Sequence, residues 1–346
     1  MKAYRSGLVV GKFAPLHNGH MLVVDRAMEL CQRVWVVSYS NPELPDYNAE
    51  RREAWLTACF PDANVLVVTP ARLASWLNGI EVPVTPANDD PDAAQREFVA
   101  TLCARVLGSH VEAVFTSEDY GAGFATHLTR RFRDMDPGAP QVHHVMVDRA
   151  RSAVPVSASQ LRRNLWAHWH FLPPPVARSL VRRIALLGGE SSGKTALASR
   201  LAEELGTRWV PEYGRALWEA KRGALLYGDM TRIAHEQIGR EEAALDAARG
   251  FVFCDTSPLT TLFYSRQIFG RAEPELELAA QRPYSVVVLC APDFPFVQDG
   301  TRRDAEFRGQ QHTWYENELQ VRGVAYEVAR GTLAERVRFV RQLLAV

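Results

Sequence analysis

The sequence predicts an α/β protein of two consecutive domains, each a parallel sheet flanked by helices. Short apolar runs alternate with helical patterns along the whole chain, which is typical of βαβ units. A chain of 346 residues has room for about two domains of ordinary size. The stretch 170–183 contains three consecutive prolines, which cannot continue a helix and favour an extended spacer. We therefore predict a first domain over 1–172, a Pro-rich linker over 173–181 and a second domain over 182–346.

The composition restricts the partners and the compartment. The 40 Lys and Arg residues balance 40 Asp and Glu residues, so the bulk charge favours neither a nucleic acid nor a membrane surface. No apolar run approaches the ~18 residues of a membrane span, and the N-terminus lacks the pattern of a signal peptide. The five cysteines are odd in number and widely spaced, which argues against disulfides or a zinc site. We expect a cytoplasmic protein with reduced thiols, and homo-oligomer formation is left open.

Nine apolar runs predict the strands of the two sheets. Those of the first half are 7–11, 33–40, 64–69, 112–117 and 142–148, and those of the second half are 183–189, 250–255, 284–292 and 324–329. Helical patterns lie between them. The segment 79–91 is rich in Pro, Asn and Asp and predicts a surface loop before a helix that begins near Asp92.

The eight residues GGESSGKT, at 188–195, have the spacing of a phosphate-binding P-loop, with a strand before them and a helical pattern after them. Such a loop wraps backbone N–H groups around a β-phosphate, while Lys194 reaches the β- and γ-phosphate oxygens and the Thr195 hydroxyl holds Mg²⁺. The alternative, a chance turn of Gly and Ser, does not account for both flanks. The predicted nucleotide-binding residues are Gly188, Gly189, Glu190, Ser191, Ser192, Gly193 and Thr195.

Asp255 ends the apolar run FVFC, where a P-loop protein places a carboxylate that meets Mg²⁺ or accepts a substrate hydroxyl proton. The alternative is a helix N-cap, although Thr256 or Ser257 would cap equally well.

The stretch DGTRRDAEFRGQQ, at 299–311, gathers Arg302, Arg303 and Arg308 in a polar segment that contains glycine. We interpret it as an arginine-bearing lid over transferring phosphates, and the alternative is a solvated charged loop.

A P-loop alone does not separate a kinase from an ATPase or a GTPase. The lack of an N-K-x-D-like stretch argues against a GTPase, and the short domain favours a kinase of small metabolites. The stretch WVPEYGR, at 209–215, lies where such kinases bring in the acceptor. Trp209 or Tyr213 can stack on a flat ring, and Glu212 can hydrogen-bond ribose hydroxyls or neutralise a cationic base. Core aromatics and a carboxylate at a helix start are the alternative.

A histidine-containing turn follows the first strand, in GKFAPLHNGH at 11–20. An Asn-Gly pair between His17 and His20 forces a tight turn into a helix, so both imidazoles face the helix N-terminus. There they can donate to triphosphate oxygens as charge develops, with no nucleophilic role. The pair supplies too few ligands for a metal site, and a structural role at the turn is the alternative.

A second turn, in VPVSASQLRRN at 154–164, offers Ser157 and Ser159 as capping hydroxyls and Arg162 one turn into a helix. In this type of sheet, ligands bind outside the carboxyl ends of the strands, at the point where the strand order reverses. Two such turns that meet there would form a site for a nucleoside triphosphate.

These motifs resemble those of a known family. The G-x-F-x-P-x-H-x-G-H stretch and the late S-x-S-x-x-R turn resemble the nucleotidyltransferases that adenylylate nicotinamide mononucleotide, phosphopantetheine and similar acceptors. More narrowly, TSEDYGAGFA, VPVSASQLRRN, GGESSGKT, PEYGR, CDTSPLTT and APDFPFVQDGTRR, in that order, resemble NadR-type proteins over essentially the whole chain. In that family a Rossmann-like nicotinamide-mononucleotide adenylyltransferase is fused to a P-loop ribosylnicotinamide kinase.

The resemblance implies two consecutive steps of NAD salvage. The second domain would transfer the γ-phosphate of ATP to the ribose 5′-hydroxyl of nicotinamide riboside, giving nicotinamide mononucleotide. The first domain would join that product to the α-phosphate of a second ATP, giving NAD and pyrophosphate. ATP is then a co-substrate, Mg²⁺ is the implied cofactor, and no covalent enzyme nucleophile is expected because both steps are direct transfers.

The resemblance also implies roles for particular residues. Those for adenylyl transfer are Lys12, His17, His20 and Arg162 at the transition state, Gly11 and Phe13 in the backbone that receives the nucleotide, and Ser117, Glu118 and Tyr120 near nicotinamide or adenosine. Those for the kinase are Lys194 and Thr195 on phosphate and Mg²⁺, Asp255 as base or metal ligand, and Arg302 and Arg303 in the lid.

The sequence departs from the family in three places. Ser257 stands where a second Asp is frequent, and the SAS triplet ends in Ser159 where Thr is frequent. The first strand starts near Gly7, so we expect neither the helix-turn-helix of some members nor their repressor role. Two alternative functions stay open from the residues: an NAD or ATP sensor without turnover, and an adenylyltransferase for another acceptor such as phosphopantetheine.

Overall fold

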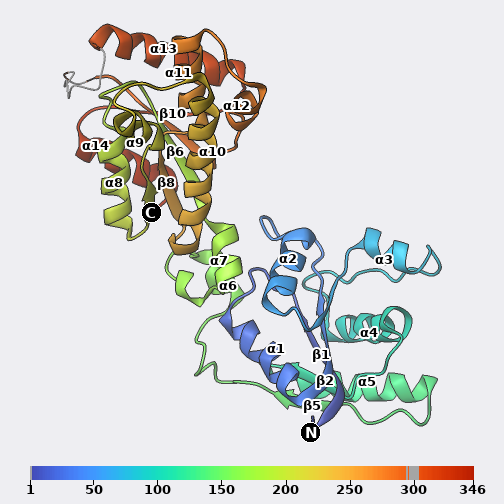
Figure 1. Cartoon of the computed structure of the whole chain (residues 1–346). Helices are drawn as coiled ribbons and strands as arrows, with labels where there is room; N and C mark the ends of the chain where they lie inside the picture. The colour runs from blue at the N-terminus through green and yellow to red at the C-terminus, as the bar shows by residue number, and fades with distance from the viewer. Residues whose placement is uncertain (1, 294, 296–303) are drawn as a thin grey trace. The chain divides into compact units, whose positions relative to one another are not determined.

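The computed structural model describes residues 2–293, 295 and 304–346 (Figure 1). The chain divides into two compact units, Met1–Val176 and Ala177–Val346, and each contains a five-stranded sheet. Every strand pairing in both sheets is parallel. The predicted α/β class, with helices that flank parallel sheets, is therefore confirmed.

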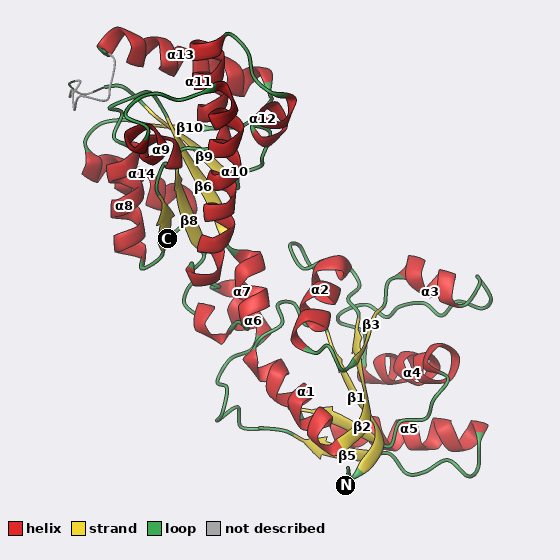
Figure 2. Ribbon diagram, viewed as in Figure 1, coloured by secondary structure: helices red, strands yellow, loops and turns green. Residues whose placement is uncertain are grey.

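The first unit alternates strands and helices around one sheet (Figure 2). Its strands are β1 (Tyr4–Gly11), β2 (Cys31–Ser38), β3 (Asn64–Val67), β4 (Ala113–Thr116) and β5 (His143–Met146). Its helices are α1 (Asn18–Leu30), α2 (Ala49–Cys59), α3 (Pro70–Trp76), α4 (Asp92–Leu102), α5 (Gly121–Met135) and α6 (Ala158–Arg163), with short turns η1 (Cys103–Leu107) and η2 (Trp169–Phe171). The strand order is β3-β2-β1-β4-β5, so it reverses between β1 and β4. Figure 1 shows α1 and α2 on one side of this sheet and α4 and α5 on the other.

The second unit has the same architecture with a different strand order. Its strands are β6 (Arg182–Leu187), β7 (Arg208–Val210), β8 (Phe251–Asp255), β9 (Val286–Cys290) and β10 (Glu327–Ala329). Its helices are α8 (Lys194–Leu205), α9 (Tyr213–Ala220), α10 (Tyr227–Ala244), α11 (Pro258–Phe269), α12 (Pro274–Ala279), α13 (Ala305–Val321) and α14 (Leu333–Leu344), with a 3₁₀ turn η3 (Leu245–Ala247). The order is β10-β9-β6-β8-β7, which puts β6 at the centre, beside β8 and β9.

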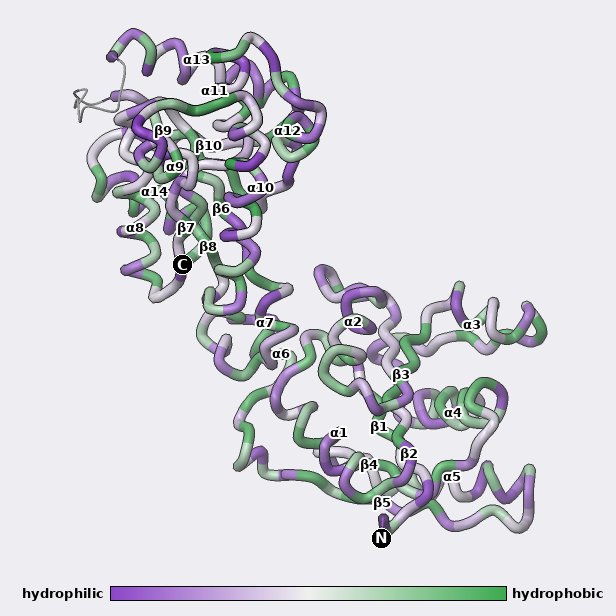
Figure 3. The backbone as a smooth tube through the Cα atoms, viewed as in Figure 1, coloured by the Kyte–Doolittle hydropathy of each residue, from purple (hydrophilic) through white to green (hydrophobic). Residues whose placement is uncertain are grey.

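The apolar runs form these strands because central parallel strands are covered on both faces. Figure 3 shows hydrophobic stretches inside each unit, and β8 and β9 consist almost wholly of buried apolar residues. In the first unit the central strand β1 also needs a glycine at Gly7. A Cβ atom there would lie 2.5 Å from Sγ of Cys31 and 2.9 Å from the ring of Phe115. The close approach of β1 to these side chains therefore disfavours any larger residue at this position.

Two sequence expectations about elements were wrong. The short strand β7 was not predicted, because only its three residues 208–210 pair with β8. The prolines do not form an extended spacer: helix α7 (Pro174–Leu180) begins at the second of them. Proline is tolerated in the first turn of a helix because its missing N–H would have no intrahelical partner there. The segment 79–91 is a surface loop as predicted, with only Thr85 and Pro86 buried.

Across the described residues, no helix is both long enough and apolar enough to cross a membrane.

Replacing Gly7 with Ala should destabilise the first unit by about 1–3 kcal/mol, because a Cβ atom there overpacks the interior. Urea unfolding of the whole chain measures this loss, with the transition of the first unit assigned by limited proteolysis. The matched control is Gly239→Ala in the interior of α10, where nothing lies within 4 Å of the added Cβ. That change should stabilise the second unit by up to about 1 kcal/mol. An unchanged first transition in Gly7→Ala would contradict the packing argument.

Candidate active sites

The residues of GGESSGKT join the central strand β6 to helix α8 in the second unit. Gly188 has a φ of +141°, and a Cβ atom on it would lie 2.7 Å from the carbonyl oxygen of Cys290. Gly193 has a φ of +80° and precedes the first residue of α8. Lys194 folds back over the loop and donates from Nζ to the carbonyl oxygens of Gly188 and Gly189, at 2.9 and 3.0 Å. Residues 191–195 line an open depression beside this lysine, as a phosphate cradle requires.

The predicted metal-binding pair lies together at the edge of this depression. The Thr195 hydroxyl donates to Oδ2 of Asp255 at 2.5 Å. Asp255 is 2% exposed, and its Oδ1 is buried with no hydrogen-bond partner among the described residues. Hydroxyl and carboxylate oxygens are ligands that Mg²⁺ prefers, and Mg²⁺ commonly takes only one or two protein ligands beside phosphates and water. The donor set therefore fits Mg²⁺, although the described residues contain no cluster of three or more His, Cys, Asp or Glu that could hold a metal.

Asp255 is not the N-cap of the helix that follows it. Ser257 is the N-cap of α11, and its hydroxyl accepts from the Leu259 N–H at 3.2 Å. Burial raises the pKa of the Asp255 carboxyl, while the Lys194 charge and the Thr195 hydroxyl act in the opposite direction. A buried carboxylate that has no capping task and a raised pKa is suited to accept a proton.

A cavity of about 170 Å³ opens beside the P-loop. Lys194 and Glu190 line it from the P-loop side, and Glu212, Trp218 and Tyr264 line it from the start of α9, from α9 and from α11. The cavity therefore combines two carboxylates, two basic side chains, of Lys194 and Arg215, and two aromatic side chains.

Hydrogen bonds and burial affect the pKa values of the side chains that line this cavity. The Tyr264 hydroxyl donates to Oε1 of Glu190 at 2.8 Å, and the Glu190 N–H donates to Oε1 of Gln311, also at 2.8 Å. Burial raises the pKa of Glu212; the Lys194 charge opposes this shift and the Asp255 carboxylate adds to it. Burial raises the pKa of Tyr264 well above its ordinary value, so its hydroxyl remains a donor.

The cavity contains different aromatic residues from those expected. Tyr213 is not among its lining residues; its N–H donates to Gln237, and its ring lies 4.4 Å from the guanidinium carbon of Arg240. Trp209 lines the depression formed by the P-loop instead. Sequence reasoning missed Trp218 and Tyr264, because only the packing of α9 and of α11 against α10 brings their side chains to the cavity.

The predicted lid is described only in part. Arg302 and Arg303 lie outside the described residues. Arg308 does not belong to a solvated loop: it is 8% exposed and lies in the first half of helix α13. Its backbone passes beside the P-loop, since a Cβ atom on Gly189 would lie 2.7 Å from the Arg308 carbonyl oxygen, and the lid role stays a prediction.

In the first unit, the two histidines of the turn after β1 cap helix α1. Nδ1 of His17 accepts from the Gly19 N–H at 3.1 Å, and Nδ1 of His20 accepts from the His17 N–H at 3.3 Å. Both Nδ1 atoms therefore act as acceptors, so the proton of each neutral imidazole resides on Nε2 and can be donated. The rings stack with centroids 3.8 Å apart. The pKa of His17 is lowered to about 4, and that of His20 is lowered well below its ordinary value. Burial is the main cause in both cases, and the charge of Arg151 contributes to both shifts.

The second turn meets this loop through Arg162. Its guanidinium donates to the Ala14 carbonyl oxygen at 2.5 Å and to the Ser159 hydroxyl at 3.0 Å. Ser157 is the N-cap of α6 and accepts from the Gln160 N–H at 3.2 Å. Burial lowers the pKa of Lys12, and the charge of Arg162 lowers it further. The two predicted turns, far apart in the sequence, thus form one site with Lys12 and both histidines.

The loop after β1 also shows why glycine stands at position 11 and phenylalanine at position 13. Phe13 is 1% exposed with a φ of +50°, and its ring lies edge-on to His20 with centroids 4.9 Å apart. A Cβ atom on Gly11 would lie 3.3 Å from the Phe13 ring. Glycine at position 11 therefore leaves room for the ring that supports His20.

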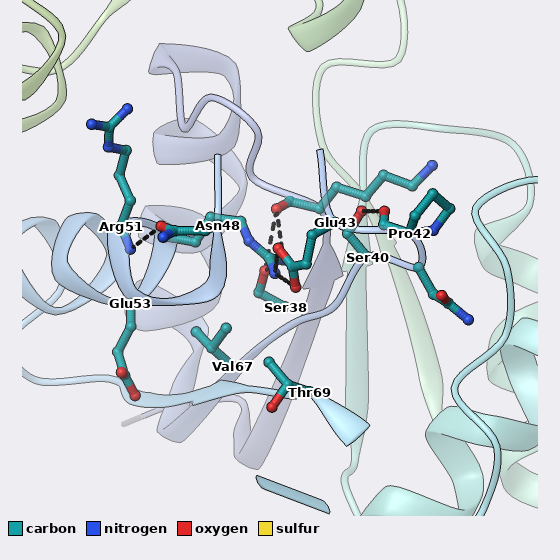
Figure 4. A network of polar contacts seen from close by, with 12 residues as sticks. Ser38, Ser40, Pro42, Glu43, Asn48, Arg51, Glu53, Val67 and Thr69 are labelled. Atoms are coloured by element: carbon teal, nitrogen blue, oxygen red, sulfur yellow. Dashed lines mark hydrogen bonds and ion pairs between the residues drawn. The ribbon is translucent and has the colours of Figure 1, made fainter. Parts of the chain in front are cut away.

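Behind Lys12 lies a buried arginine that sequence reasoning missed. Arg52 of α2 is fully buried and donates to the Ser38 hydroxyl at 2.7 Å and to both carboxylate oxygens of Glu43, at 2.7 and 2.9 Å. The Ser38 hydroxyl in turn donates to the Lys12 carbonyl oxygen at 3.2 Å. Figure 4 shows Ser38 and Glu43 within this network. Nζ of Lys12 donates to the Asn88 carbonyl oxygen at 3.2 Å, so the loop 79–91 holds the side chain while Arg52 and Ser38 hold the backbone.

Ser117, Glu118 and Tyr120 follow β4, at the reversal of the strand order. Glu118 accepts from the Arg151 guanidinium at 3.1 Å, so this segment is tied to the chain that leads into α6. Ser117 is half-buried, and burial raises the pKa of Tyr120 to about 12. The sequence gives no indication that Arg151 belongs to this site. Only its contact with Glu118 and its effect on the pKa of both histidines distinguish it from other arginines.

The fold and both sites define a class: a transferase that joins a nucleotidyltransferase-like unit to a P-loop kinase-like unit. Residues 8–164 match the cytidylyltransferase-like family, and residues 183–336 match an AAA domain family.

Comparisons with known proteins identify a more particular likeness. The chain is 27% identical over 328 residues to the trifunctional NAD biosynthesis/regulator protein NadR of Escherichia coli K12, over 86% of this chain and 71% of that protein. The NadR of Salmonella typhimurium LT2 matches to the same extent. A phosphopantetheine adenylyltransferase of Streptococcus pyogenes serotype M5 is 42% identical over 65 residues, which is 18% of this chain and 40% of that protein.

The fold is that of solved NadR structures over the whole chain. A NadR protein in complex with NAD and AMP-PNP superposes with a TM-score of 0.70 at 20% identity, over 100% of this chain and 98% of that chain. A NadR protein in complex with NR gives the same values. The predicted resemblance to NadR-type proteins is thereby confirmed.

The stability of the first unit should fall as the pH drops from about 6.5 toward 4. The unfolded chain protonates His17 near its ordinary pKa of 6.5, whereas the folded unit holds that pKa at about 4, so acid favours the unfolded state in this window. The contribution of His17 is about 3 kcal/mol, present in full above pH 6.5. His17→Asn keeps a capping oxygen and should remove the His17 share of this decline in urea unfolding at pH 7, 6 and 5, while the share of His20, whose pKa is also lowered, remains.

The control for this measurement is His170→Asn, at an exposed position of the same unit. It should leave the pH dependence of the wild type in place. An equally steep decline in His17→Asn would show that the capped imidazole is not the group responsible.

Proposed function

We propose that the chain is a bifunctional enzyme of NAD salvage that phosphorylates nicotinamide riboside in its second unit and adenylylates nicotinamide mononucleotide in its first. The observation that carries the proposal is the cavity beside the P-loop, which is lined by carboxylates and aromatic side chains. Glu190 and Glu212 offer negative charge, and Trp218 and Tyr264 offer flat faces, within reach of Lys194. Nicotinamide riboside is a flat pyridinium cation, for which carboxylates and aromatic faces are suitable partners. Full-length likeness to NadR proteins supports the same reading.

In the proposed kinase step, the ribose 5′-oxygen forms a bond to the γ-phosphorus of ATP while the bond to the β-bridging oxygen breaks, releasing ADP. Asp255, which has no capping task, would either accept the hydroxyl proton or hold Mg²⁺ as described next, since a carboxylate bound to the ion is not free to act as the base. Lys194 and the loop N–H groups hold the phosphates in line. Arg302 and Arg303 remain predicted lid residues.

Thr195 and Asp255 would hold Mg²⁺ through their oxygens. The Thr195 hydroxyl oxygen and Oδ2 of Asp255 lie 2.5 Å apart, so both can face the same ion. When bound there, the ion would neutralise charge on the β- and γ-phosphates. We therefore propose Mg²⁺ as the cofactor of this unit.

In the proposed adenylyl transfer, a phosphate oxygen of nicotinamide mononucleotide bonds to the α-phosphorus of ATP, and pyrophosphate leaves. The attacking phosphate is already an anion, so the enzyme needs no general base. Nε2–H of His17 and His20, together with Lys12 and Arg162, would donate to the oxygens on which charge develops. Glu118 and Tyr120 lie at the neighbouring strand end, where the base or the nicotinamide would bind.

The direct test is to incubate the purified chain with Mg²⁺, ATP and nicotinamide riboside and to separate the products by chromatography. The proposal expects nicotinamide mononucleotide, NAD, ADP and pyrophosphate. Mononucleotide and ADP without NAD would refute the role of the first unit and favour a sensor or another acceptor. The absence of all four products would refute both steps.

Single substitutions should separate the two activities. Lys194→Ala should lower the kinase rate by a factor of about 100 or more and spare adenylyl transfer, since the lysine holds only the kinase phosphates. His20→Ala should do the reverse, because the first unit loses a donor and a helix cap together. Initial rates with nicotinamide riboside and with nicotinamide mononucleotide measure the two steps separately. Loss of both activities in either variant would refute independent sites.

Glu212→Gln should weaken selection of the cationic acceptor. The change removes a negative charge from the cavity but keeps its shape, so KM for nicotinamide riboside should rise about tenfold while KM for ATP changes little. Glu219→Gln, exposed on the same helix α9, is the matched control. The neutral, reduced form of nicotinamide riboside should show a smaller difference between wild type and Glu212→Gln. Equal losses for the cationic and neutral acceptors would show that charge is not what Glu212 recognises.

A further inference from the structure

Arg336 is a buried arginine on α14 that connects three segments around the P-loop. It is 1% exposed, although arginine is almost never fully buried unless paired. Its guanidinium donates to the carbonyl oxygens of Ser192 at 2.7 Å, Ala291 at 2.8 Å and Gly331 at 2.9 Å. These three oxygens belong to the P-loop, the end of β9 and the turn before α14.

The bond to Ser192 determines how one peptide group of the P-loop is oriented. In a planar trans peptide, the carbonyl oxygen and the following N–H point in opposite directions. Since Arg336 holds the Ser192 oxygen on the α14 side, the Gly193 N–H points to the opposite side. Ser192, Gly193 and Lys194 all line the open depression of the P-loop. The Gly193 N–H is thus directed toward the space in which a phosphate would lie.

Asp293 compensates the buried charge and fixes its position. It pairs with the guanidinium of Arg336, and its Oδ2 accepts from the Gly331 N–H at 2.7 Å. The Arg336 charge and the Gly331 N–H both hold the pKa of Asp293 below its ordinary value, against the effect of burial. The guanidinium of Arg336 is therefore paired with a carboxylate and also bound to three carbonyl oxygens. A cation placed only to solubilise α14 would face water, as the exposed Arg338 two residues further along does.

We propose that Arg336 is a positioning residue for the P-loop: by holding the Ser192 carbonyl from behind, it orients the Gly193 N–H toward the β-phosphate of ATP. The inference rests on the proposed ATP site of the second unit and goes beyond it, since Arg336 lies outside the P-loop motif and touches no substrate. Without the guanidinium, this peptide group is free to turn, and the cradle loses a fixed donor. Loss of the guanidinium should therefore weaken the binding of ATP and leave the binding of the acceptor unchanged.

The test compares Arg336→Met and Arg336→Lys with Arg338→Met in the full chain. Arg336→Met should raise KM for ATP in the kinase reaction about tenfold or more, because a charged donor to the loop is lost. KM for nicotinamide riboside should change less than twofold. Arg336→Lys keeps the charge but cannot reach all three carbonyl oxygens, so its KM for ATP should lie between wild type and Arg336→Met. Arg338→Met should match wild type, and adenylyl transfer in the first unit should stay constant in all variants.

Calorimetric titration with Mg²⁺-ATP makes the test independent of turnover. The binding component that is absent in Lys194→Ala belongs to the second unit, and Arg336→Met should weaken that component alone. The wild type could bind ATP in the second unit and yet phosphorylate no nicotinamide riboside. That result would refute the proposed function, but the ATP affinities of the Arg336 variants would still test the positioning role. A merely structural role predicts a lower unfolding temperature with an unchanged ATP affinity, and that result overturns the proposal. Should Arg336→Met not fold, Arg336→Lys decides: an unchanged ATP affinity in it refutes the positioning role.

Discussion

A guanidinium that donates to the carbonyl oxygens of a phosphate-facing loop is the interaction on which both sites depend. A loop that turns its N–H groups toward an anion must turn carbonyl oxygens away from it, and buried carbonyls need donors. In the second unit Arg336 donates to the Ser192 oxygen. In the first unit Arg162 donates to the Ala14 oxygen, and Arg52 acts on the Lys12 oxygen through Ser38. Two loops of unrelated sequence are thus supported in the same way.

Arginine suits this role because its planar fork carries five donors in fixed directions. A buried cation is costly unless it is paired, and each fully buried arginine here has a carboxylate from a nearby loop. Glu43 pairs with Arg52, and Asp293 pairs with Arg336. The paired carboxylates lie after β2 and after β9, at the same edges of the sheets as the loops that they support. Packing, charge balance and loop geometry are therefore coupled: a change in the pair alters the loop as well as the stability.

Local sequence patterns predicted most of the fold and the main site residues, because each of those features is encoded within a few residues. Apolar runs bounded by turns predicted nine strands, and glycine spacing predicted the loop around Lys194. The missed features depend on distant parts of the chain. Arg52 and Arg336 lie in helices of an arginine-rich sequence, where nothing local separates a buried arginine from an exposed one. Trp218 lines the cavity only because α9 packs beside α10, which no short stretch encodes.

The two sites differ in charge as their proposed substrates differ. In the first unit, burial and the charge of Arg162 lower the pKa of Lys12, and burial and the charge of Arg151 lower the pKa of both histidines, so the site disfavours additional positive charge. ATP and a mononucleotide both carry phosphates, and either relieves this repulsion on binding. In the second unit, Asp255 and Glu212 lie around Lys194, and each raises the cost of ionising the other. Such a mixture suits one anionic and one cationic substrate side by side. The support of the P-loop does not distinguish one acceptor from another, so the proposed function assigns the choice of acceptor to the carboxylates and not to the phosphate cradle.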